Sequence, residues 1–468
     1  MRLIKNSGYT LASSVLGGLF FFFVNALVAR HLGAEGFGAY TFVLAFLSFF
    51  FMLANIGMDS VIVRELARNW NAKDSIIGGA VMLRTLFSLA AMILSVALIR
   101  VLNYSEFIQY GVLLVALTLL TNSLVSLWWS VFQARFEMKW YALTNLSGRA
   151  GILALTIFFI LQKQGVLWLL AVHTLAGIVQ LIIVWVLAAK RITFTLKFDK
   201  ERILFLLRES WPLALAGLFI SLYYRVDVFM LSFWRPQQDI GYYAAVYTIT
   251  EAPAMISVAL NASLYPLLSQ LHTVKNKFQQ YSAWSVKAMM VLALPMAIGT
   301  TILAQPVINV VYGQAYTASV PVLQVLIWAG GIIMTNVIIA SMLNALGAQK
   351  ITTTATGFNL MLNAALNLYA IPRYGIMGAA ATTVATELVC GLMMWYALYK
   401  KNYQIIHYSW LRCVFAAILM GAVVYTIKSL QLPIVIIVGM LSYAIFLFLL
   451  KGITAADINI FHRIWRMK

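Results

Sequence analysis

Residues 9–29 read YTLASSVLGGLFFFFVNALVA, a run of apolar and small residues of membrane length. A helix needs about 20 such residues to cross the hydrocarbon core of a bilayer, because every backbone polar group must be bonded inside the helix. Arg2 and Lys5 before the run, with Leu27 and Ala29 at its end, resemble a cleavable signal peptide. We expect an uncleaved first span instead, because the run is longer than a typical signal core.

Runs of the same kind recur to the end of the sequence. Of 468 residues, 63% are apolar and 10% are charged, and the mean hydropathy is +0.89. A soluble domain has about 45–50% apolar and about 25% charged residues. We therefore predict an all-α integral membrane protein with about fourteen transmembrane helices. The spans are expected near 9–29, 39–62, 76–99, 108–132, 141–161, 166–188, 211–233, 241–266, 284–305, 322–346, 352–371, 376–399, 409–427 and 433–450.

Basic residues outnumber acidic ones, with 33 Lys and Arg against 14 Asp and Glu. They gather in short loops between the spans, so we interpret them as a cytoplasmic-loop bias beside anionic lipid and not as a nucleic-acid surface. With the amino terminus inside, these basic loops fall on the inner side. Both termini are therefore predicted to be cytoplasmic.

The longest polar stretch, residues 191–210, is predicted to be an interfacial connector between an N-terminal six-helix lobe at 1–190 and a C-terminal six-helix lobe at 211–400. Two additional helices and a cytoplasmic tail would occupy 401–468. A weak internal repeat supports two lobes, because GFGAY at 36–40 is echoed by DIGYY at 239–243. Two six-span units share an orientation, which predicts a pseudo-two-fold axis along the membrane normal.

Four short segments resemble a known family: RHLGAEGFGAY at 30–40, GMDS at 57–60, RELAR at 64–68 and YGIMGAA at 374–380. Their order and spacing are similar to those of the polysaccharide-transporter branch of the multidrug/oligosaccharidyl-lipid/polysaccharide (MOP) exporter superfamily, which includes Wzx-type O-antigen flippases. The resemblance covers essentially residues 1–400.

The resemblance implies an alternating-access flippase that moves undecaprenyl-pyrophosphate-linked oligosaccharide from the cytoplasmic to the periplasmic leaflet. It implies a multi-pass protein of the bacterial inner membrane, with a glycan polymerase and chain-length proteins of the same pathway as partners. A monomer without nucleic acid, cofactor or metal is expected. Cys390 and Cys413 lie in apolar runs without metal-ligand spacing.

Arginines at mid-span are the candidate cargo contacts. An Arg at the centre of a span costs roughly 2.5–3.5 kcal/mol, so it must be paired, hydrated or functional. Arg84 and Arg149 both lie about eight residues from the inner end of their spans, roughly 12 Å deep. Asp59 is the acid of the first lobe near that level, so one guanidinium would be left for a pyrophosphate. The alternative is that Arg84 pairs with Asp59 while Arg149 bonds backbone carbonyls or water.

Four more charged residues carry two possible roles. Arg225 could contact the cargo, or it could pair with Glu251 at matching depth on the next span. Asp227, Glu251, Asp59 and also Glu387 could carry protons if transport is coupled to an ion gradient. Structural pairing is the alternative for each of them. Lys287 and Arg412 lie near span ends, where their side chains can reach the interface.

A polar stripe follows one helix face through Thr352, Thr356, Asn359, Asn363 and Asn367. Asn145 with Arg149 begins a similar stripe in the first lobe. Such amides could line a cavity that passes sugar hydroxyls, or they could bond neighbouring helices. Among them Asn145, Asn359 and Asn363 are predicted to contact the substrate. Pro253 and Pro295 interrupt spans and could act as hinges.

Two other function classes remain open. A membrane glycan polymerase or ligase would also be polytopic and basic, but it needs sizeable outer loops with catalytic groups, and the longest one here, 306–321, has no charge. No nucleotide, zinc or nucleophile motif is present. An ion-coupled multidrug or cation exporter of the same superfamily would share the architecture and differ in the charge of its cavity.

Overall fold

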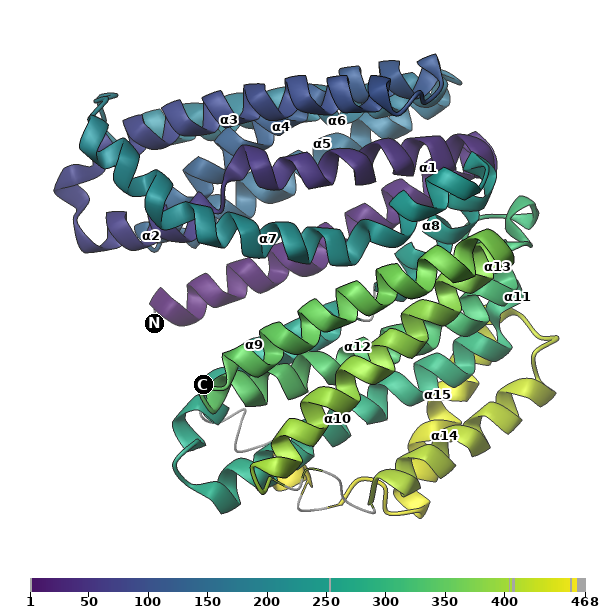
Figure 1. Ribbon diagram of the computed structural model, residues 1–468. Helices are drawn as coiled ribbons and strands as arrows, with labels where there is room; N and C mark the ends of the chain where they lie inside the picture. The colour runs from purple at the N-terminus through teal and green to yellow at the C-terminus, as the bar shows by residue number, and fades with distance from the viewer. Residues whose placement is uncertain (1, 252–253, 404, 406–408, 455–456, 461–468) are drawn as a thin grey trace. The chain divides into compact units, whose positions relative to one another are not determined.

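The computed structural model describes residues 2–251, 254–403, 405, 409–454 and 457–460, and all elements within these ranges are helical. The chain divides into two compact units, Met1–Gly241 and Tyr242–Lys468 (Figure 1). The helices of the first unit are α1 (Arg2–Asn55), α2 (Met58–Arg68), the 3-10 turn η1 (Trp70–Ala72), α3 (Lys73–Val101), α4 (Glu106–Ala134), α5 (Met138–Leu161), α6 (Val166–Ala189), α7 (Lys200–Trp234) and the start of α8 (Gln237–Glu251).

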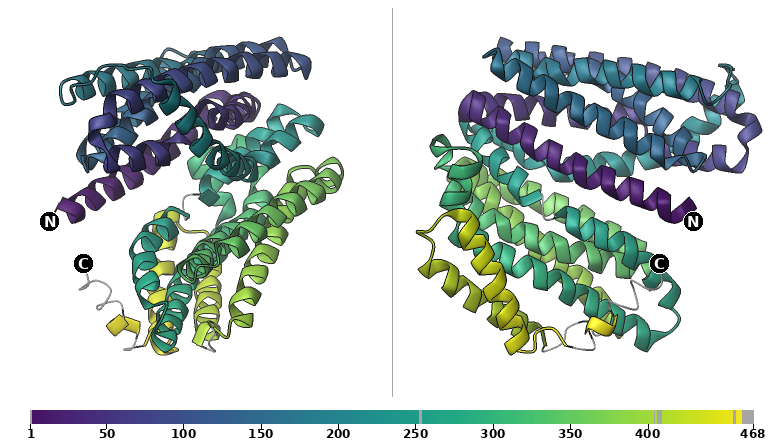
Figure 2. Two further views of the ribbon diagram at one scale, coloured as in Figure 1. Left: turned by 60° about the vertical axis from the view of Figure 1, so that its left-hand side comes forward. Right: turned by 180° about the vertical axis from the view of Figure 1, so that it is seen from behind.

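The second unit holds the rest of α8 and the elements that follow it. These are α9 (Ala254–Leu271), α10 (Lys275–Ile302), α11 (Ala304–Val311), the 3-10 turn η2 (Gln314–Tyr316), α12 (Ser319–Ala345), α13 (Gln349–Lys400), α14 (Ser409–Thr426) and α15 (Leu432–Leu449). Within it α12 packs against α13 and α10, while α14 packs against α10 and α15 (Figure 2). The C-terminal helices therefore belong to the second unit.

Two helices are too long to cross a bilayer once. The 54 residues of α1 and the 52 residues of α13 would each extend about 80 Å at 1.5 Å per residue, against a hydrocarbon core of about 30 Å. Each is interrupted by one glycine with a positive φ, Gly33 at 67° and Gly375 at 59°. A residue with a β-carbon rarely adopts this conformation. The breaks fall between the spans predicted at 9–29 and 39–62, and between those at 352–371 and 376–399.

Within the described residues, ten helices are long and apolar enough to cross a membrane, counting α1 with α2 as one and α13 as one. The fold is therefore that of a multi-pass membrane protein, while the count of fourteen stays a prediction. The span predicted at 241–266 corresponds to α8 and α9. Pro253, one of the two predicted hinges, lies outside the described residues, and Pro295 lies inside α10.

The connector predicted at 191–210 stays a prediction, and its second half is helical in the structure. Residues 200–210 continue without interruption into the 35-residue helix α7. Asp199 starts that helix, since its side chain accepts hydrogen bonds from the backbone of Glu201 and Arg202. Helix α7 packs against α1, α2 and α3. The division between the two compact units falls within α8, after Gly241.

Helices α1 and α8 meet with almost no side chain between them. A β-carbon added to Gly38 would lie 1.7 Å from the carbonyl oxygen of Gln237, and one added to Gly241 would lie 1.9 Å from that of Ala34. The contact is reciprocal along the chain, because Gln237 and Gly241 follow Ala34 and Gly38 by the same number of residues. Gly38 and Gly241 belong to the segments of the weak internal repeat, GFGAY and DIGYY, and Ala34 and Gln237 lie just before them.

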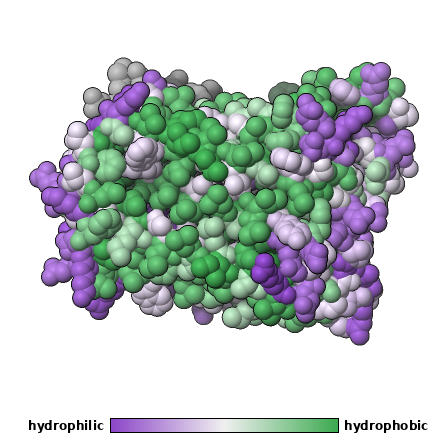
Figure 3. Space-filling view, turned by 90° about the horizontal axis from the view of Figure 1, so that it is seen from above, coloured by the Kyte–Doolittle hydropathy of each residue, from purple (hydrophilic) through white to green (hydrophobic). Residues whose placement is uncertain are grey.

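Much of the helix surface is apolar, as lipid contact requires. Figure 3 shows one face that is hydrophobic across its middle, with hydrophilic residues gathered toward two opposite ends. Large apolar side chains such as Ile93, Leu113 and Ile182 are more than half exposed on α3, α4 and α6. In a soluble protein such surface would be an aggregation hazard, whereas in a bilayer it is the contact with the acyl chains.

Candidate functional site

Arg84 forms an ion pair inside the first unit. It lies in α3 with no exposed side-chain surface, and its Nη2 donates to Asp59 Oδ1 at 2.7 Å. Its Nη1 donates to the backbone carbonyl of Ser123 on α4. This geometry matches the pairing alternative for Arg84. The guanidinium joins α2, α3 and α4 at one point.

Asp59 is held by neutral donors as well. Its Oδ2 accepts from the amide of Asn55 at 2.6 Å, and its Oδ1 also accepts from the hydroxyls of Ser126 and Ser130 on α4. The Asp59 side chain is 42% exposed, in contrast to the fully buried Arg84. The carboxylate is therefore partly exposed, whereas the guanidinium is fully buried between helices.

Arg149 on α5 has a different environment. Its Nη1 donates to the carbonyl of Gly17 on α1 at 3.0 Å, and its Nε donates to Asn145 Oδ1 at 3.4 Å. Asn145 in turn donates to Ser13 at 3.0 Å. Among the described residues, no carboxylate lies within 4.0 Å of this guanidinium, and its side chain is half-buried. Arg149 is thus a cation whose hydrogen bonds go to neutral oxygens.

Close packing of α1 on α5 holds Arg149 in place. A β-carbon at Gly17 would lie 2.8 Å from the Cδ and Nε atoms of the Arg149 side chain. Because Gly17 has no side chain, the Arg149 side chain can lie directly on the backbone of α1. Arg84 and Arg149 share no hydrogen-bond partner within the described part of the chain, so the structure does not join the two predicted cargo arginines into one cluster.

The polar stripe of α13 is buried between the two arms of that helix. Asn363 donates to Thr386 at 3.3 Å, Asn367 donates to Asn363 at 2.9 Å, and Thr382 donates to Asn367. The asparagines are at most 5% exposed. This arrangement matches the alternative in which the amides bond neighbouring helices.

Glu387 lies at the end of the same network and is 4% exposed. It accepts a hydrogen bond from Asn336 of α12 at 2.9 Å and another from Asn359 at 3.4 Å. Both donors are neutral amides. Within the described residues no Lys, Arg or His forms an ion pair with this carboxyl group. The second unit thus buries an acid among amides and hydroxyls.

The remaining predicted residues lie on α7 and α8. Arg225 is partly buried and Asp227 is 7% exposed on α7, and Glu251 is the last residue of α8. None of the three is without a partner. The pairing of Arg225 with Glu251 stays a prediction.

Sequence reasoning missed the ion pair of Lys287. Lys287 in α10 was expected to reach the interface from near a span end, and its Nζ lies 2.6 Å from Asp457 Oδ2. Asp457 also accepts from the backbone and the hydroxyl of Thr454. The Asp457 carbonyl accepts from the indole of Trp284 at 3.1 Å. The signal was weak, because 170 residues separate the two charges.

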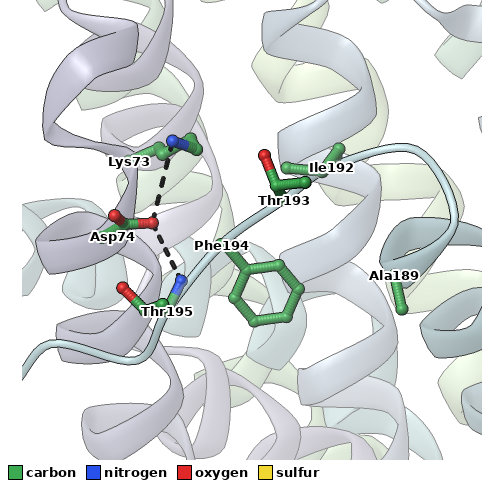
Figure 4. A pocket seen from close by; sticks show the side chains of 7 residues that line it. All are labelled: Lys73, Asp74, Ala189, Ile192, Thr193, Phe194 and Thr195. Atoms are coloured by element: carbon green, nitrogen blue, oxygen red, sulfur yellow. Dashed lines mark hydrogen bonds and ion pairs between the residues drawn. The ribbon is translucent and has the colours of Figure 1, made fainter.

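A pocket of about 510 Å³ lies where the loop after α6 crosses the start of α3, lined by Lys73, Asp74, Ala189, Ile192, Thr193, Phe194 and Thr195 (Figure 4). Asp74 Oδ1 accepts from the backbone amide of Thr195 at 3.0 Å and lies 3.8 Å from Lys73 Nζ. The aspartate therefore fastens the loop to α3. None of the predicted site residues lines this pocket.

Comparison with known proteins agrees with this architecture. The family described as polysaccharide biosynthesis protein matches residues 3–272, and the family described as MatE matches 212–369. The chain is 24% identical to the "Probable low-salt glycan biosynthesis flippase Agl15" of Haloferax volcanii, covering 95% of each protein. It is 23% identical to a "Putative O-antigen transporter" of Shigella flexneri, covering 84% of this chain and 97% of that protein.

Solved structures show the same fold. The lipid II flippase MurJ in an inward closed conformation superposes with a TM-score of 0.79 at 17% identity, covering 93% of this chain and 97% of that one. An inward-facing multidrug resistance transporter of the MATE family superposes with a TM-score of 0.70 at 14% identity, covering 83% and 95%.

These relatives and neighbours are named as transporters or flippases, which removes the polymerase or ligase alternative. The polysaccharide biosynthesis match extends over more than half of the sequence. The chain belongs to the polysaccharide biosynthesis protein family, and it is a membrane transporter and not an enzyme.

Proposed function

We propose that this protein is an alternating-access flippase for undecaprenyl-pyrophosphate-linked oligosaccharide, an O-antigen or similar repeat unit. It carries the cargo from the cytoplasmic to the periplasmic leaflet of the bacterial inner membrane, with both termini cytoplasmic. The names of the relatives support the class of cargo, since they include a glycan biosynthesis flippase and an O-antigen transporter. A glycan polymerase and chain-length proteins of the same pathway are the proposed partners of a monomer.

Arg149 carries the proposal. A half-buried guanidinium that is bonded only to neutral oxygens keeps its full charge available. A diphosphate can accept two parallel hydrogen bonds from such a group, and hydrogen bonds between charged partners are about twice as strong as neutral ones. Asn145 is the proposed second donor, because it lies one turn away on α5 and bonds the same side chain.

The other predicted contacts take roles that follow from their bonding. Arg84 is proposed to act on the cargo indirectly, since it is already paired with Asp59 and its side chain is fully buried. Arg225 is proposed as a second phosphate contact. Asn359 and Asn363 are proposed to meet sugar hydroxyls only in a conformation that separates the two arms of α13, because here they are bonded across those arms.

Four acids are the proposed candidates for ion coupling: Asp59, Asp227, Glu251 and Glu387. Glu387 is favoured because it is buried against neutral amides and has no cationic partner among the described residues. A buried carboxyl group in such surroundings gains from binding a proton or a cation.

The test is export of lipid-linked glycan in a strain that lacks its own flippase. Arg149→Ala removes a charge-assisted contact worth about 1.5–3 kcal/mol, so export should fall roughly tenfold to a hundredfold. Arg149→Lys should retain part of the activity, because it keeps the charge and loses the fork. Arg100→Ala is the matched control, as Arg100 is exposed at the end of α3. Normal export by Arg149→Ala at equal protein abundance would refute the proposal.

An ion-coupled multidrug or cation exporter is the second candidate. The MatE match and the MATE-family neighbour favour it. The two functions differ in what Arg149 does, because a cationic cargo is repelled by a guanidinium. Under this alternative Arg149→Ala leaves drug resistance intact or raises it, and the wild-type gene confers resistance in a drug-sensitive host.

A further inference from the structure

The ends of α4, α5 and α6 meet around one tryptophan on the side of the first unit where basic loops gather. Trp140 lies in the first turn of α5 and is partly buried. The guanidinium carbon of Arg191, just beyond α6, lies 3.8 Å from the centre of its ring. The ammonium of Lys139 lies 5.3 Å from the same ring centre. One indole therefore holds two cations.

These two cations have no anionic partner in the part of the chain that the structure describes. Neither Arg191 nor Lys139 lies within 4.0 Å of a carboxylate oxygen, and both side chains are exposed. Their charged groups are no further apart than the sum of their distances to the ring centre. Two cations beside one ring without a carboxylate partner give this surface a positive potential that attracts an anion.

A neighbouring pair fixes the geometry of the site. Arg135, which follows α4, donates to the backbone carbonyl of Arg191 at 3.2 Å. Arg135 Nη2 forms an ion pair with Glu137 Oε1 at 3.2 Å, and the Arg135 guanidinium carbon lies 5.2 Å from the ring centre of Trp70. Arg135 thus ties the loop after α4 to the loop after α6. Glu137 is committed to Arg135, so it does not neutralise the two cations on Trp140.

Apolar surface adjoins the cations. Leu143, one turn further along α5, is 47% exposed, and Val186 near the end of α6 is 40% exposed. Phe136 beside the loop is 64% exposed. Tryptophan with Lys or Arg at a helix end is typical of the membrane interface, where headgroup phosphates lie above acyl chains. The cations therefore match the headgroup phosphate of a lipid, and the adjoining apolar side chains match its acyl chains.

We propose that Lys139, Arg191 and Trp140 form a binding site for the headgroup phosphate of an anionic glycerophospholipid, whose acyl chains lie along the exposed faces of α5 and α6. Arg191 and Lys139 donate hydrogen bonds to the phosphate, and the indole supports both cations. The site is separate from Arg149, which lies about 14 Å further along α5 at 1.5 Å per residue. Occupancy anchors the junction of the three helix ends to the leaflet.

The experiment measures lipid retention by native mass spectrometry of the purified full-length protein. Phosphatidylglycerol is compared with phosphatidylcholine, undecaprenyl phosphate and inorganic phosphate as probes. Phosphatidylglycerol should be retained more strongly than phosphatidylcholine, and inorganic phosphate should not displace it. In the Lys139→Gln/Arg191→Gln variant, the preference for phosphatidylglycerol over phosphatidylcholine should fall roughly tenfold, since each surface cation contributes measurable affinity for anionic lipid.

Two variants keep the result interpretable. Arg100→Gln/Lys163→Gln removes the same charge from exposed positions far from Trp140 and should retain the preference. Lys139→Arg/Arg191→Lys keeps the charge and should also retain it, which excludes misfolding as the cause of a loss. An equal fall in the Arg100/Lys163 control would reduce the effect to net charge. If the Lys139→Gln/Arg191→Gln variant loses undecaprenyl phosphate and keeps phosphatidylglycerol, or if inorganic phosphate displaces phosphatidylglycerol, the phospholipid assignment is overturned.

Discussion

Arg84 and Arg149 differ more in the structure than in the sequence. Both lie at similar depth in apolar runs, yet Arg84 is sealed against Asp59 and Arg149 rests on Gly17 with neutral partners. Sequence reasoning could name Asp59 as a partner, because it lies on the neighbouring hairpin arm. It could not choose which arginine would take it, since that depends on the rotation of α3 and α5 about their axes.

The Arg84–Asp59 pair should respond unequally to loss of either partner. Asp59→Asn leaves a fully buried guanidinium without its counter-charge, so the free energy of unfolding should fall by about 3–5 kcal/mol. Arg84→Met leaves a half-exposed carboxylate that keeps Asn55, Ser126 and Ser130, so the loss should be smaller. Thermal unfolding of both variants in detergent measures the order. The reverse order would show that the carboxylate is the sealed partner.

The Lys287–Asp457 contact should weaken in acid. Burial raises the pKa of the Asp457 carboxyl group, but hydrogen bonds from Lys287 and Thr454 outweigh it, so the pKa lies below its ordinary value of about 4. A lowered pKa in the folded state gives stability that is complete above the ordinary value and is lost as pH falls through the lowered one. Asp457→Asn should therefore destabilise the protein at pH 7 and change little at pH 2. Unfolding curves at both values check this, and an equal effect at both contradicts it.

At the scale of elements, the sequence predicted where apolar runs end but not how they connect. The spans on either side of Gly33 and of Gly375 were expected to be joined by loops. The structure joins them by a single kinked residue, because a glycine at positive φ turns the chain without breaking the helix on either side. Residues 200–210 were predicted to belong to an interfacial connector because the stretch is polar, and the structure places them in α7. Packing of Ile203 and Leu206 on Gly79 of α3 extends α7 through them.

Two glycines of α13 should respond in opposite directions to the same change. A β-carbon at Gly378 would lie 2.4 Å from the carbonyl oxygen of Ala370 on the other arm, whereas one at Gly357 would meet nothing within 4 Å. Gly378→Ala should therefore push the arms apart and lower stability. Gly357→Ala should raise it by about 0.5–1 kcal/mol, because alanine restricts the unfolded chain and favours helix. Thermal unfolding of the two variants measures the difference. Equal shifts of the unfolding temperature would contradict the close contact at Gly378.

At the scale of the whole molecule, the all-helical membrane fold and the family were predictable, because composition and the short glycine-rich motifs carry them. The span count and the orientation depend on which side of the membrane each loop lies. The packing of the helices does not show this. The partners of buried charges depend on contacts between distant segments, as Lys287 and Asp457 show.

Topology can be tested with reporter fusions. Lys275 begins α10 and Gln314 begins the turn η2, and they are predicted to lie on opposite sides of the membrane. An alkaline phosphatase fusion should be active at Gln314 and inactive at Lys275, while a fluorescent protein fusion should give the reverse pattern. A fusion at Lys451, predicted to be inside, serves as the control. Identical signals at Lys275 and Gln314 would overturn the predicted orientation.

The crossing of α1 and α8 at Gly38 and Gly241 has a mechanical consequence. Helices usually interlock through side chains, and turning one on another must lift those chains over each other. Here the backbones of the two helices approach each other directly, so neither helix presents a side chain at the contact. Few interlocking side chains therefore hinder rotation of one helix on the other at this contact, and a methyl group added at either glycine would clash with a backbone carbonyl oxygen.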